Sequence, residues 1–266
     1  MVDKSEKFTW LVRLGFAARG LVYILLGYLA LSTAGKAANG QSAVFELIQD
    51  VPLGTPLLYL VAIGLVAYAA FKLIDAAAGI DGHGDDAAGR AKRVGSAASG
   101  LAHLVLAYAA YEFASGARQQ AAGDAGGQEV ASGLLAWPLG WVVLGAIGLG
   151  FIAAAFFQAK NAYDAHFMKN ISRQALASIE TIGRVGHGAR AVLFAIIGWS
   201  LIQSAWAVQS NEIKGLGAAI IALSNNGILY PLVAGGLILF GVFSLIAARY
   251  RIIPDVNAHT AKPITH

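Results

Sequence analysis

Residues 13–20 read RLGFAARG, and the chain returns to this pattern twice. The second version is RVGSAASG at residues 93–100, and the third is RVGHGARA at residues 184–191. Each version opens a long stretch of apolar residues. A pattern that recurs at intervals of 80 to 91 residues is typical of a structural unit present in several copies. The sequence therefore predicts three repeats.

The second half of each unit also recurs. Pro-Leu-Gly stands at residues 52–54 and again at 138–140, and Asn-Asn-Gly takes the corresponding place at 225–227. A long apolar stretch follows each of these tripeptides. We therefore expect each repeat to contain a first helix, a loop with a short amphipathic piece, and a return helix.

Six stretches are long enough to cross the hydrocarbon core of a membrane, which takes about 20 helical residues. The predicted helices cover residues 11–33, 55–77, 94–114, 138–159, 187–208 and 228–249. The short amphipathic pieces are predicted at residues 44–48, 130–135 and 216–223, lying in the outer interface.

Composition agrees with a membrane protein. The 266 residues are 57% apolar and only 13% charged, with a mean hydropathy of +0.62, whereas an average soluble domain is about 25% charged. There is no cysteine, so disulfides and thiolate metal sites are excluded. The predicted fold is an all-α polytopic membrane protein. Since each repeat has two spans, the copies share one orientation, and a pseudo-threefold bundle is the simplest assembly.

Positive charge predicts the topology. Of the 19 Lys and Arg residues, only Lys36, Arg118 and Lys214 fall on one side of the predicted membrane. Cytoplasmic loops are enriched in these residues, so both termini are expected in the cytoplasm. We predict a single membrane domain, divided as follows: the whole domain 1–266, the repeats 10–80, 90–163 and 181–251, and the cytoplasmic tails 1–9 and 252–266.

These motifs identify a resemblance to a known family. The RLGFAARG opening followed by Val22 and Tyr23, the Pro-Leu-Gly tripeptides, and the closing ARYR at residues 248–251 resemble the bacterial membrane family catalogued as domain of unknown function 1206. The resemblance covers residues 10–251. It implies a bacterial inner-membrane protein of three tandem two-helix repeats, and it brings no established activity, ligand or catalytic residue. This chain departs from a strict repeat at Ser99, where the other copies have arginine, and the third copy lacks Pro-Leu-Gly.

Arg19 and Arg190 occupy equivalent places inside the predicted membrane, where a charged side chain is costly. With Arg13 and Arg184 they predict a cationic pocket that faces the cytoplasm and holds a phosphate or carboxylate, because the planar guanidinium fork suits either group. Two other interpretations stay open. The arginines reach the headgroups by snorkelling, or they pair with Asp75 or Asp164 at the ends of return helices.

The other polar residues inside the spans that we single out as candidates are Ser99, Tyr23 and His103. His103 is predicted near the middle of the membrane, as a neutral histidine bonded within the bundle or, alternatively, as a proton relay or haem ligand. His187 lies too far away in depth to share a metal with it. We expect no cofactor and no metal, although the acids at residues 81–86 leave a divalent cation as an alternative.

In residues 160–183 the apolar side chains recur at helical spacing and form one apolar face. An interfacial helix is therefore expected there, and a docking surface for a partner subunit is the alternative. No catalytic motif is present, and nothing suggests nucleic-acid binding. The sequence favours a non-enzymatic accessory or scaffold protein, or a lipid-binding bundle. A small transporter or channel for an anionic solute is the alternative. Expected partners are membrane lipids and either a larger membrane complex or further copies of the chain.

Overall fold

The structure is a computed structural model, and it describes residues 4–32, 40–81, 86–117, 125–175, 178–211 and 213–253. In these ranges every regular element is a helix, apart from one isolated antiparallel bridge between Ile171 and Arg251. Six helices are long and apolar enough to cross a membrane. The predicted all-α class and the six predicted spans are confirmed.

Each repeat contributes one first helix and one return helix. The first helices are α1 (Lys4–Ser32), α5 (Ala87–Ala114) and α8 (Ile179–Ala207), and the return helices are α4 (Gly54–Ala78), α7 (Gly140–Asp164) and α10 (Leu229–Tyr250). The first helices begin seven or eight residues before the predicted starts. At α5 the reason is local, because the Asp86 carboxylate accepts a hydrogen bond from the Gly89 N–H at 2.8 Å and so caps the extra turns.

Three short helices precede the return helices, as predicted: α3 (Gly40–Gln49), α6 (Ala125–Leu135) and α9 (Leu216–Ile221). In α3 the Val44 and Phe45 side chains are fully buried, and the helix packs against α1, α4 and α5. The prediction that the short pieces lie in the outer interface stays a prediction for α3. Its apolar face covers neighbouring helices, because those helices offer apolar surface at close range.

Pro-Leu-Gly has a steric role at the start of two return helices. A Cβ atom on Gly54 would lie 2.0 Å from the carbonyl oxygen of Ile48, and one on Gly140 would lie 1.7 Å from that of Leu134. Only glycine allows the chain to turn this tightly from the short helix into the return helix.

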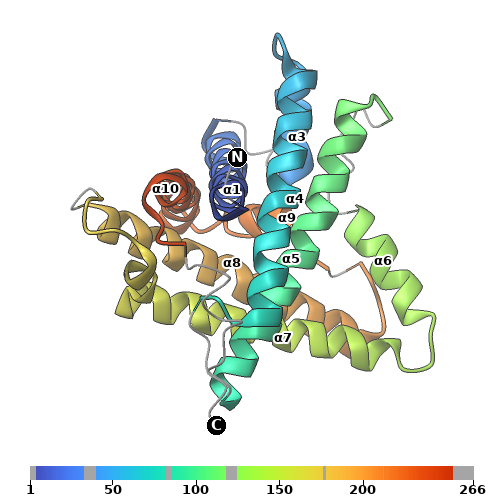
Figure 1. Ribbon diagram of the computed structural model, residues 1–266. Helices are drawn as coiled ribbons and strands as arrows, with labels where there is room; N and C mark the ends of the chain where they lie inside the picture. The colour runs from blue at the N-terminus through green and yellow to red at the C-terminus, as the bar shows by residue number, and fades with distance from the viewer. Residues whose placement is uncertain are drawn as a thin grey trace.

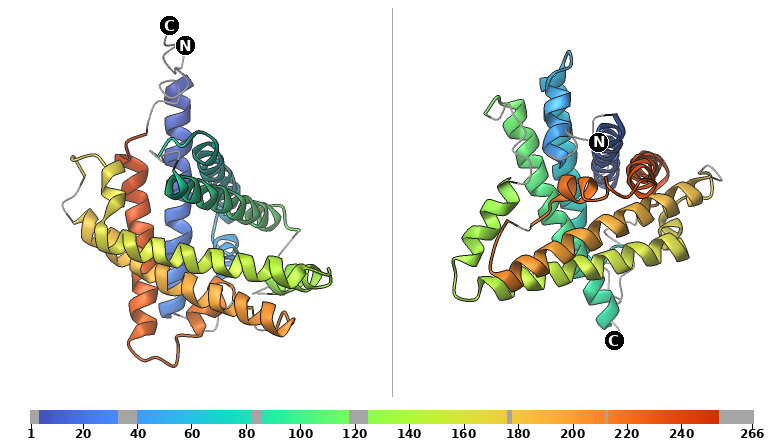
Figure 2. Two further views of the ribbon diagram at one scale, coloured as in Figure 1. Left: turned by 90° about the horizontal axis from the view of Figure 1, so that it is seen from below. Right: turned by 180° about the vertical axis from the view of Figure 1, so that it is seen from behind.

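The return helix of each repeat pairs with the first helix of the next. α4 packs along α5, α7 along α8, and α10 along α1, so the third repeat closes onto the first. Figure 1 shows the α4–α5 pair running upright, the α7–α8 pair running across it, and the α1–α10 pair seen end-on. Figure 2 shows the same three pairs meeting in one region from two further sides. The three repeats therefore assemble as three helix pairs that cross one another, and each pair takes its helices from two different repeats.

Contacts inside each repeat are less regular. α1 packs on α4 and α8 packs on α10, but no comparable packing joins α5 to α7 in the part of the chain that the structure describes. Glycines show the difference. A Cβ atom on Gly15 would lie 2.6 Å from the backbone of Tyr68, and one on Gly186 would lie 2.7 Å from that of Phe240. One on the equivalent Gly95 would meet nothing within 4 Å.

The predicted interfacial helix at residues 160–183 is not present. α7 ends at Asp164, a 3-10 helix follows at His166–Asn170, and α8 begins at Ile179. Between them the Ser172 N–H donates to the Tyr250 carbonyl at 2.9 Å, and the Ile252 N–H donates to the Asn170 carbonyl at 2.8 Å. These backbone bonds hold the segment against the end of α10 in place of helical ones.

Candidate functional site

Arg19 lies at the junction of α1, α4 and α10 and is 7% exposed. Its guanidinium donates hydrogen bonds to the Tyr68 hydroxyl on α4 and, at 3.0 Å, to the Ser244 hydroxyl on α10. The ring centre of Phe16 lies 4.6 Å from the guanidinium carbon. The protein encloses this side chain, so the snorkelling interpretation is wrong for Arg19.

Arg190 reaches the same region from α8. Its guanidinium carbon lies 4.4 Å from the ring centre of Phe240, 4.8 Å from that of Phe194 and 5.4 Å from that of Tyr23. The guanidinium carbon of Arg19 lies 5.0 Å from the same Phe240 ring centre. The two guanidinium carbons are therefore at most 9.4 Å apart, the sum of their distances to that ring. Two like charges in a low-dielectric interior repel each other strongly at this range.

No acid of the described ranges pairs with these two charges. Across the described ranges, no carboxylate lies within 4.0 Å of either guanidinium, and the Nε atoms of Arg19 and Arg190 are buried without a hydrogen-bond partner. The predicted pairing with Asp75 or Asp164 is wrong, because both carboxylates pair with lysines of their own helices. We call the group of Arg19, Arg190, Tyr23, Tyr68, Phe240 and Ser244 the arginine centre.

Arg184 is not part of this centre. It pairs with Glu180 at 2.8 Å and donates to two carbonyls at the end of α7, those of Ala162, at 2.9 Å, and Tyr163. Arg93, its equivalent in the second repeat, donates in the same way to two carbonyls at the end of α4, those of Ala76, at 2.7 Å, and Ala77. A cation near the last carbonyls of a helix is favourable. These arginines join consecutive repeats.

Arg13 is the third equivalent, and its guanidinium carbon lies 5.6 Å from the Trp10 ring centre. The predicted pocket of four arginines is therefore corrected to a centre of two, Arg19 and Arg190. The reason is their place on the helix, since Arg13 and Arg184 come six residues earlier, where Arg184 contacts the end of α7 and Arg13 lies beside Trp10.

His103 is buried, as one of the two interpretations predicted. Its Nδ1 lies 2.7 Å from the Ser99 carbonyl oxygen, and its ring centre lies 4.5 Å from that of Tyr68. Ser99 thus contributes its carbonyl to this contact. His187 bonds through Nδ1 to the Gln158 amide oxygen. Where the structure describes the chain, no three His, Cys, Asp or Glu side chains gather as a metal site would require.

Two acids form a buried network that the sequence interpretation missed. Asp75 is fully buried, accepts a hydrogen bond from the Ser96 hydroxyl at 2.6 Å, and lies 3.7 Å from the Lys72 ammonium. Asp81 pairs with Lys72 at 3.3 Å and with Arg251 at 2.5 Å. These cations already occupy the Asp81 carboxylate, which argues against the cation site considered at residues 81–86. Residues 82–85 lie outside the described ranges.

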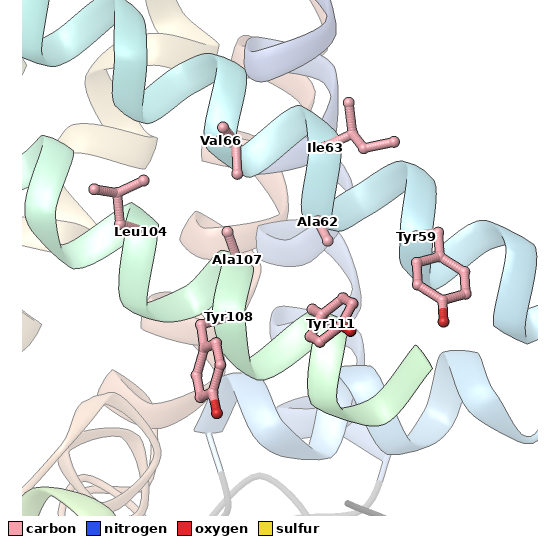
Figure 3. Close-up of a pocket in the computed structure, with 8 residues that line it drawn as sticks. All are labelled: Tyr59, Ala62, Ile63, Val66, Leu104, Ala107, Tyr108 and Tyr111. Atoms are coloured by element: carbon pink, nitrogen blue, oxygen red, sulfur yellow. The ribbon is translucent and has the colours of Figure 1, made fainter. Parts of the chain in front are cut away.

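A surface groove of about 420 Å³ lies between α4 and α5 (Figure 3). It is lined by Tyr59, Ala62, Ile63 and Val66 from α4 and by Leu104, Ala107, Tyr108 and Tyr111 from α5. No charged side chain lines it, so this groove offers nothing to neutralise an anion. The arginine centre remains the candidate site.

The segments of this chain that match a known protein family coincide with the three repeats. A family model described as Domain of Unknown Function (DUF1206) matches residues 14–79, 94–164 and 185–251. The chain belongs to the DUF1206 family. A protein of Bacillus subtilis (strain 168), "Uncharacterized protein YxxB", is 31% identical over 261 residues, which cover 93% of this chain and 94% of the relative. No solved structure matches the chain.

The DUF1206 segments give the register of the arginine centre. They begin at residues 14, 94 and 185, so Arg19, Ser99 and Arg190 are each the sixth residue of a segment. The partners on the return helices were missed from the sequence. The sequence did contain a signal for them. Tyr68 and Phe240 each stand three residues before the recurring phenylalanine near the end of the return helix, Phe71 and Phe243.

The hydroxyl of Tyr68 is expected to stabilise this DUF1206 fold. Tyr68→Phe removes one of the two hydrogen bonds given to Arg19, and a bond to a charged group contributes about 1.5–3 kcal/mol. We expect a lower thermal unfolding midpoint in detergent. Tyr23→Phe is the matched control, because it keeps the ring beside Arg190 and removes no hydrogen bond to either arginine. Equal midpoints for the two variants would contradict the prediction.

Proposed function

We propose that this protein is a non-catalytic membrane bundle that binds an anionic group at the arginine centre. One observation carries the proposal. Two guanidiniums at most 9.4 Å apart lie among aromatic rings, Arg19 buried and Arg190 partly exposed, with both Nε atoms unbonded and no carboxylate within 4.0 Å of them in the described ranges. Buried charges are paired in stable proteins, because an unpaired one keeps its full desolvation cost. A bound anion supplies the missing charge.

The expected ligand carries a phosphate or carboxylate group. Either group accepts charge-assisted hydrogen bonds from guanidinium N–H donors, and its negative charge removes the repulsion between Arg19 and Arg190. The apolar surroundings favour an anion that is itself part of a lipid. We place the protein in a bacterial inner membrane with both termini in the cytoplasm, where the excess of positive loop charge would lie.

Transport of an anionic solute is the second candidate, because it also needs a cation inside the membrane. Two pockets in the described ranges lie elsewhere, one along α4 and α5 and the other beside the ends of α6 and α8, and neither is lined by Arg19 or Arg190. These pockets give no support to a transport pathway through the arginine centre.

Native mass spectrometry tests the proposal. The protein is purified in mild detergent and titrated with phosphatidylglycerol in one arm and with inorganic phosphate in the other. We expect a lipid adduct with the wild type and its loss in Arg19→Ala/Arg190→Ala. Arg93→Ala/Arg184→Ala is the matched control. It removes the same amount of charge, but from side chains that already donate hydrogen bonds to backbone carbonyl oxygens. Binding of phosphate alone would identify a soluble anion as the ligand.

Equal lipid binding by the wild type and Arg19→Ala/Arg190→Ala would overturn the proposal. If the double alanine variant does not fold, Arg19→Lys/Arg190→Lys keeps both charges and removes the planar fork. It is expected to fold and to bind phosphatidylglycerol more weakly than the wild type. Unchanged affinity in that variant would equally count against a guanidinium site.

A further inference from the structure

The second repeat is open at the place where the first and third are closed. A Cβ atom on Gly64 of α4 would lie 2.5 Å from the Ala18 Cβ on α1, and one on Gly236 of α10 would lie 2.5 Å from the Ala189 Cβ on α8. The equivalent Gly150 of α7 has nothing within 4 Å of a Cβ position. The first and third repeats therefore share one close helix contact, and α5 and α7 do not make it.

The sequence nevertheless keeps the residues of that contact in the second repeat. Gly95 and Ala98 stand on α5 at the places of Gly15 and Ala18, and Gly150 stands on α7 at the place of Gly64. Glycine is among the weakest helix formers, so two glycines facing no neighbour weaken both helices without any gain from packing. A close approach between α5 and α7 would compensate for this loss by packing, because small residues let two helix backbones come into contact.

Two large side chains that meet in the closed repeats are replaced by small ones in the second repeat. The first repeat places Arg19 against Tyr68 at its contact, and the third places Arg190 against Phe240. The second repeat has two small residues at these places, Ser99 and Ala154. At these two places the second repeat therefore carries neither a charge nor a large ring.

We propose that the second repeat alternates between this open arrangement and a closed one in which α5 packs on α7 as α1 packs on α4. Closing forms the Gly95 and Gly150 contacts that the other repeats already have, and it completes the third side of the assembly. The structure shows the open arrangement. This inference stands apart from the proposed function, because it needs no anion at the arginine centre.

Disulfide trapping tests the closure directly, since the chain has no cysteine of its own. Ala98→Cys/Gly150→Cys places one thiol on each helix at exposed positions that fold equally well in the open arrangement. A disulfide needs Cβ atoms about 3.5–4.5 Å apart. The equivalent Cβ positions lie 2.5 Å apart in the closed first repeat, so an approach of α5 to α7 that stops slightly short of that contact already forms the bond, whereas the open arrangement leaves the Gly150 position with no neighbour within 4 Å. We expect mild oxidation in native membrane vesicles to give an intramolecular bond in most chains, seen as a faster monomer band on a non-reducing gel.

Two controls make the result specific. Leu104→Cys/Gly150→Cys is expected to stay reduced, because Leu104 lines the groove beside α4. Adding Gly95→Leu to Ala98→Cys/Gly150→Cys fills the contact and is expected to remove most of the disulfide, with unchanged helix content by circular dichroism. A folded Ala98→Cys/Gly150→Cys protein that forms no bond would overturn the closure. A bond found only in dimers would also overturn it and would assign this surface to a second copy.

Discussion

Gly15→Leu is expected to prevent the bundle from folding, whereas Gly95→Leu at the equivalent place in the second repeat is expected to be tolerated. A Cβ atom on Gly15 would lie 2.6 Å from the backbone nitrogen of Tyr68, so a side chain there forces α1 away from α4. Overpacking a helix contact costs about 1–3 kcal/mol and occasionally more. Because the clash is with backbone rather than with a movable side chain, we expect the upper end of that range or beyond.

Gly95→Leu meets no neighbour within 4 Å, and leucine is a better helix former than glycine by up to about 1 kcal/mol. The two variants are compared by the folded fraction recovered in mild detergent and by the thermal unfolding midpoint. Gly186→Leu in the third repeat is expected to behave like Gly15→Leu, since it faces the backbone of Phe240 at 2.7 Å. Equal loss in all three variants would show that α5 and α7 are already packed.

Asp75→Ala is expected to be the most damaging change to a single charged residue. The carboxylate is fully buried, and its removal leaves the Ser96 hydroxyl and the Asp81 N–H, bonded at 2.6 and 2.8 Å, without an acceptor. Lys72 also loses one of its two anionic neighbours. Removing one partner of a buried ion pair costs about 3–5 kcal/mol.

Asp75→Asn separates charge from hydrogen bonding, because the amide oxygen still accepts from one of the two donors while the charge is lost. We expect it to fall between the wild type and Asp75→Ala in unfolding by denaturing detergent, followed by circular dichroism. Glu180→Ala is the control, since the Glu180–Arg184 pair is exposed and such pairs contribute about 0.2–1 kcal/mol. A loss for Asp75→Ala no greater than for Glu180→Ala would contradict the buried network.

The opening between α5 and α7 bears on how an anion would reach Arg190. This arginine is partly exposed and comes from α8, the partner of α7, whereas Arg19 is enclosed by α1, α4 and α10. A change in the α5–α7 contact would therefore act on the two arginines differently. Repeating the phosphatidylglycerol titration with the oxidised Ala98→Cys/Gly150→Cys protein measures this dependence.

The sequence by itself determined the class of protein, the six long helices and their threefold repetition. These are properties of local composition and spacing, since apolar length decides which segments can cross a membrane and recurring motifs mark equivalent positions. It also singled out Arg19 and Arg190 as equivalent residues. The interfacial helix predicted at residues 160–183 failed because backbone bonds to Tyr250 and Ile252, far along the chain, replaced the helical ones.

Only the tertiary structure decided which side chains meet. Arg13 and Arg184 have the same residue type as Arg19 and Arg190, yet Arg184 binds a carbonyl at the end of α7 and Arg13 lies beside the exposed Trp10 ring. Likewise, Gly15 and Gly95 are equivalent in sequence, but one faces a backbone at 2.6 Å and the other faces open space. A sequence motif records what a helix surface is able to contact. Whether the contact forms depends on where the partner helix lies, and long-range packing sets that position.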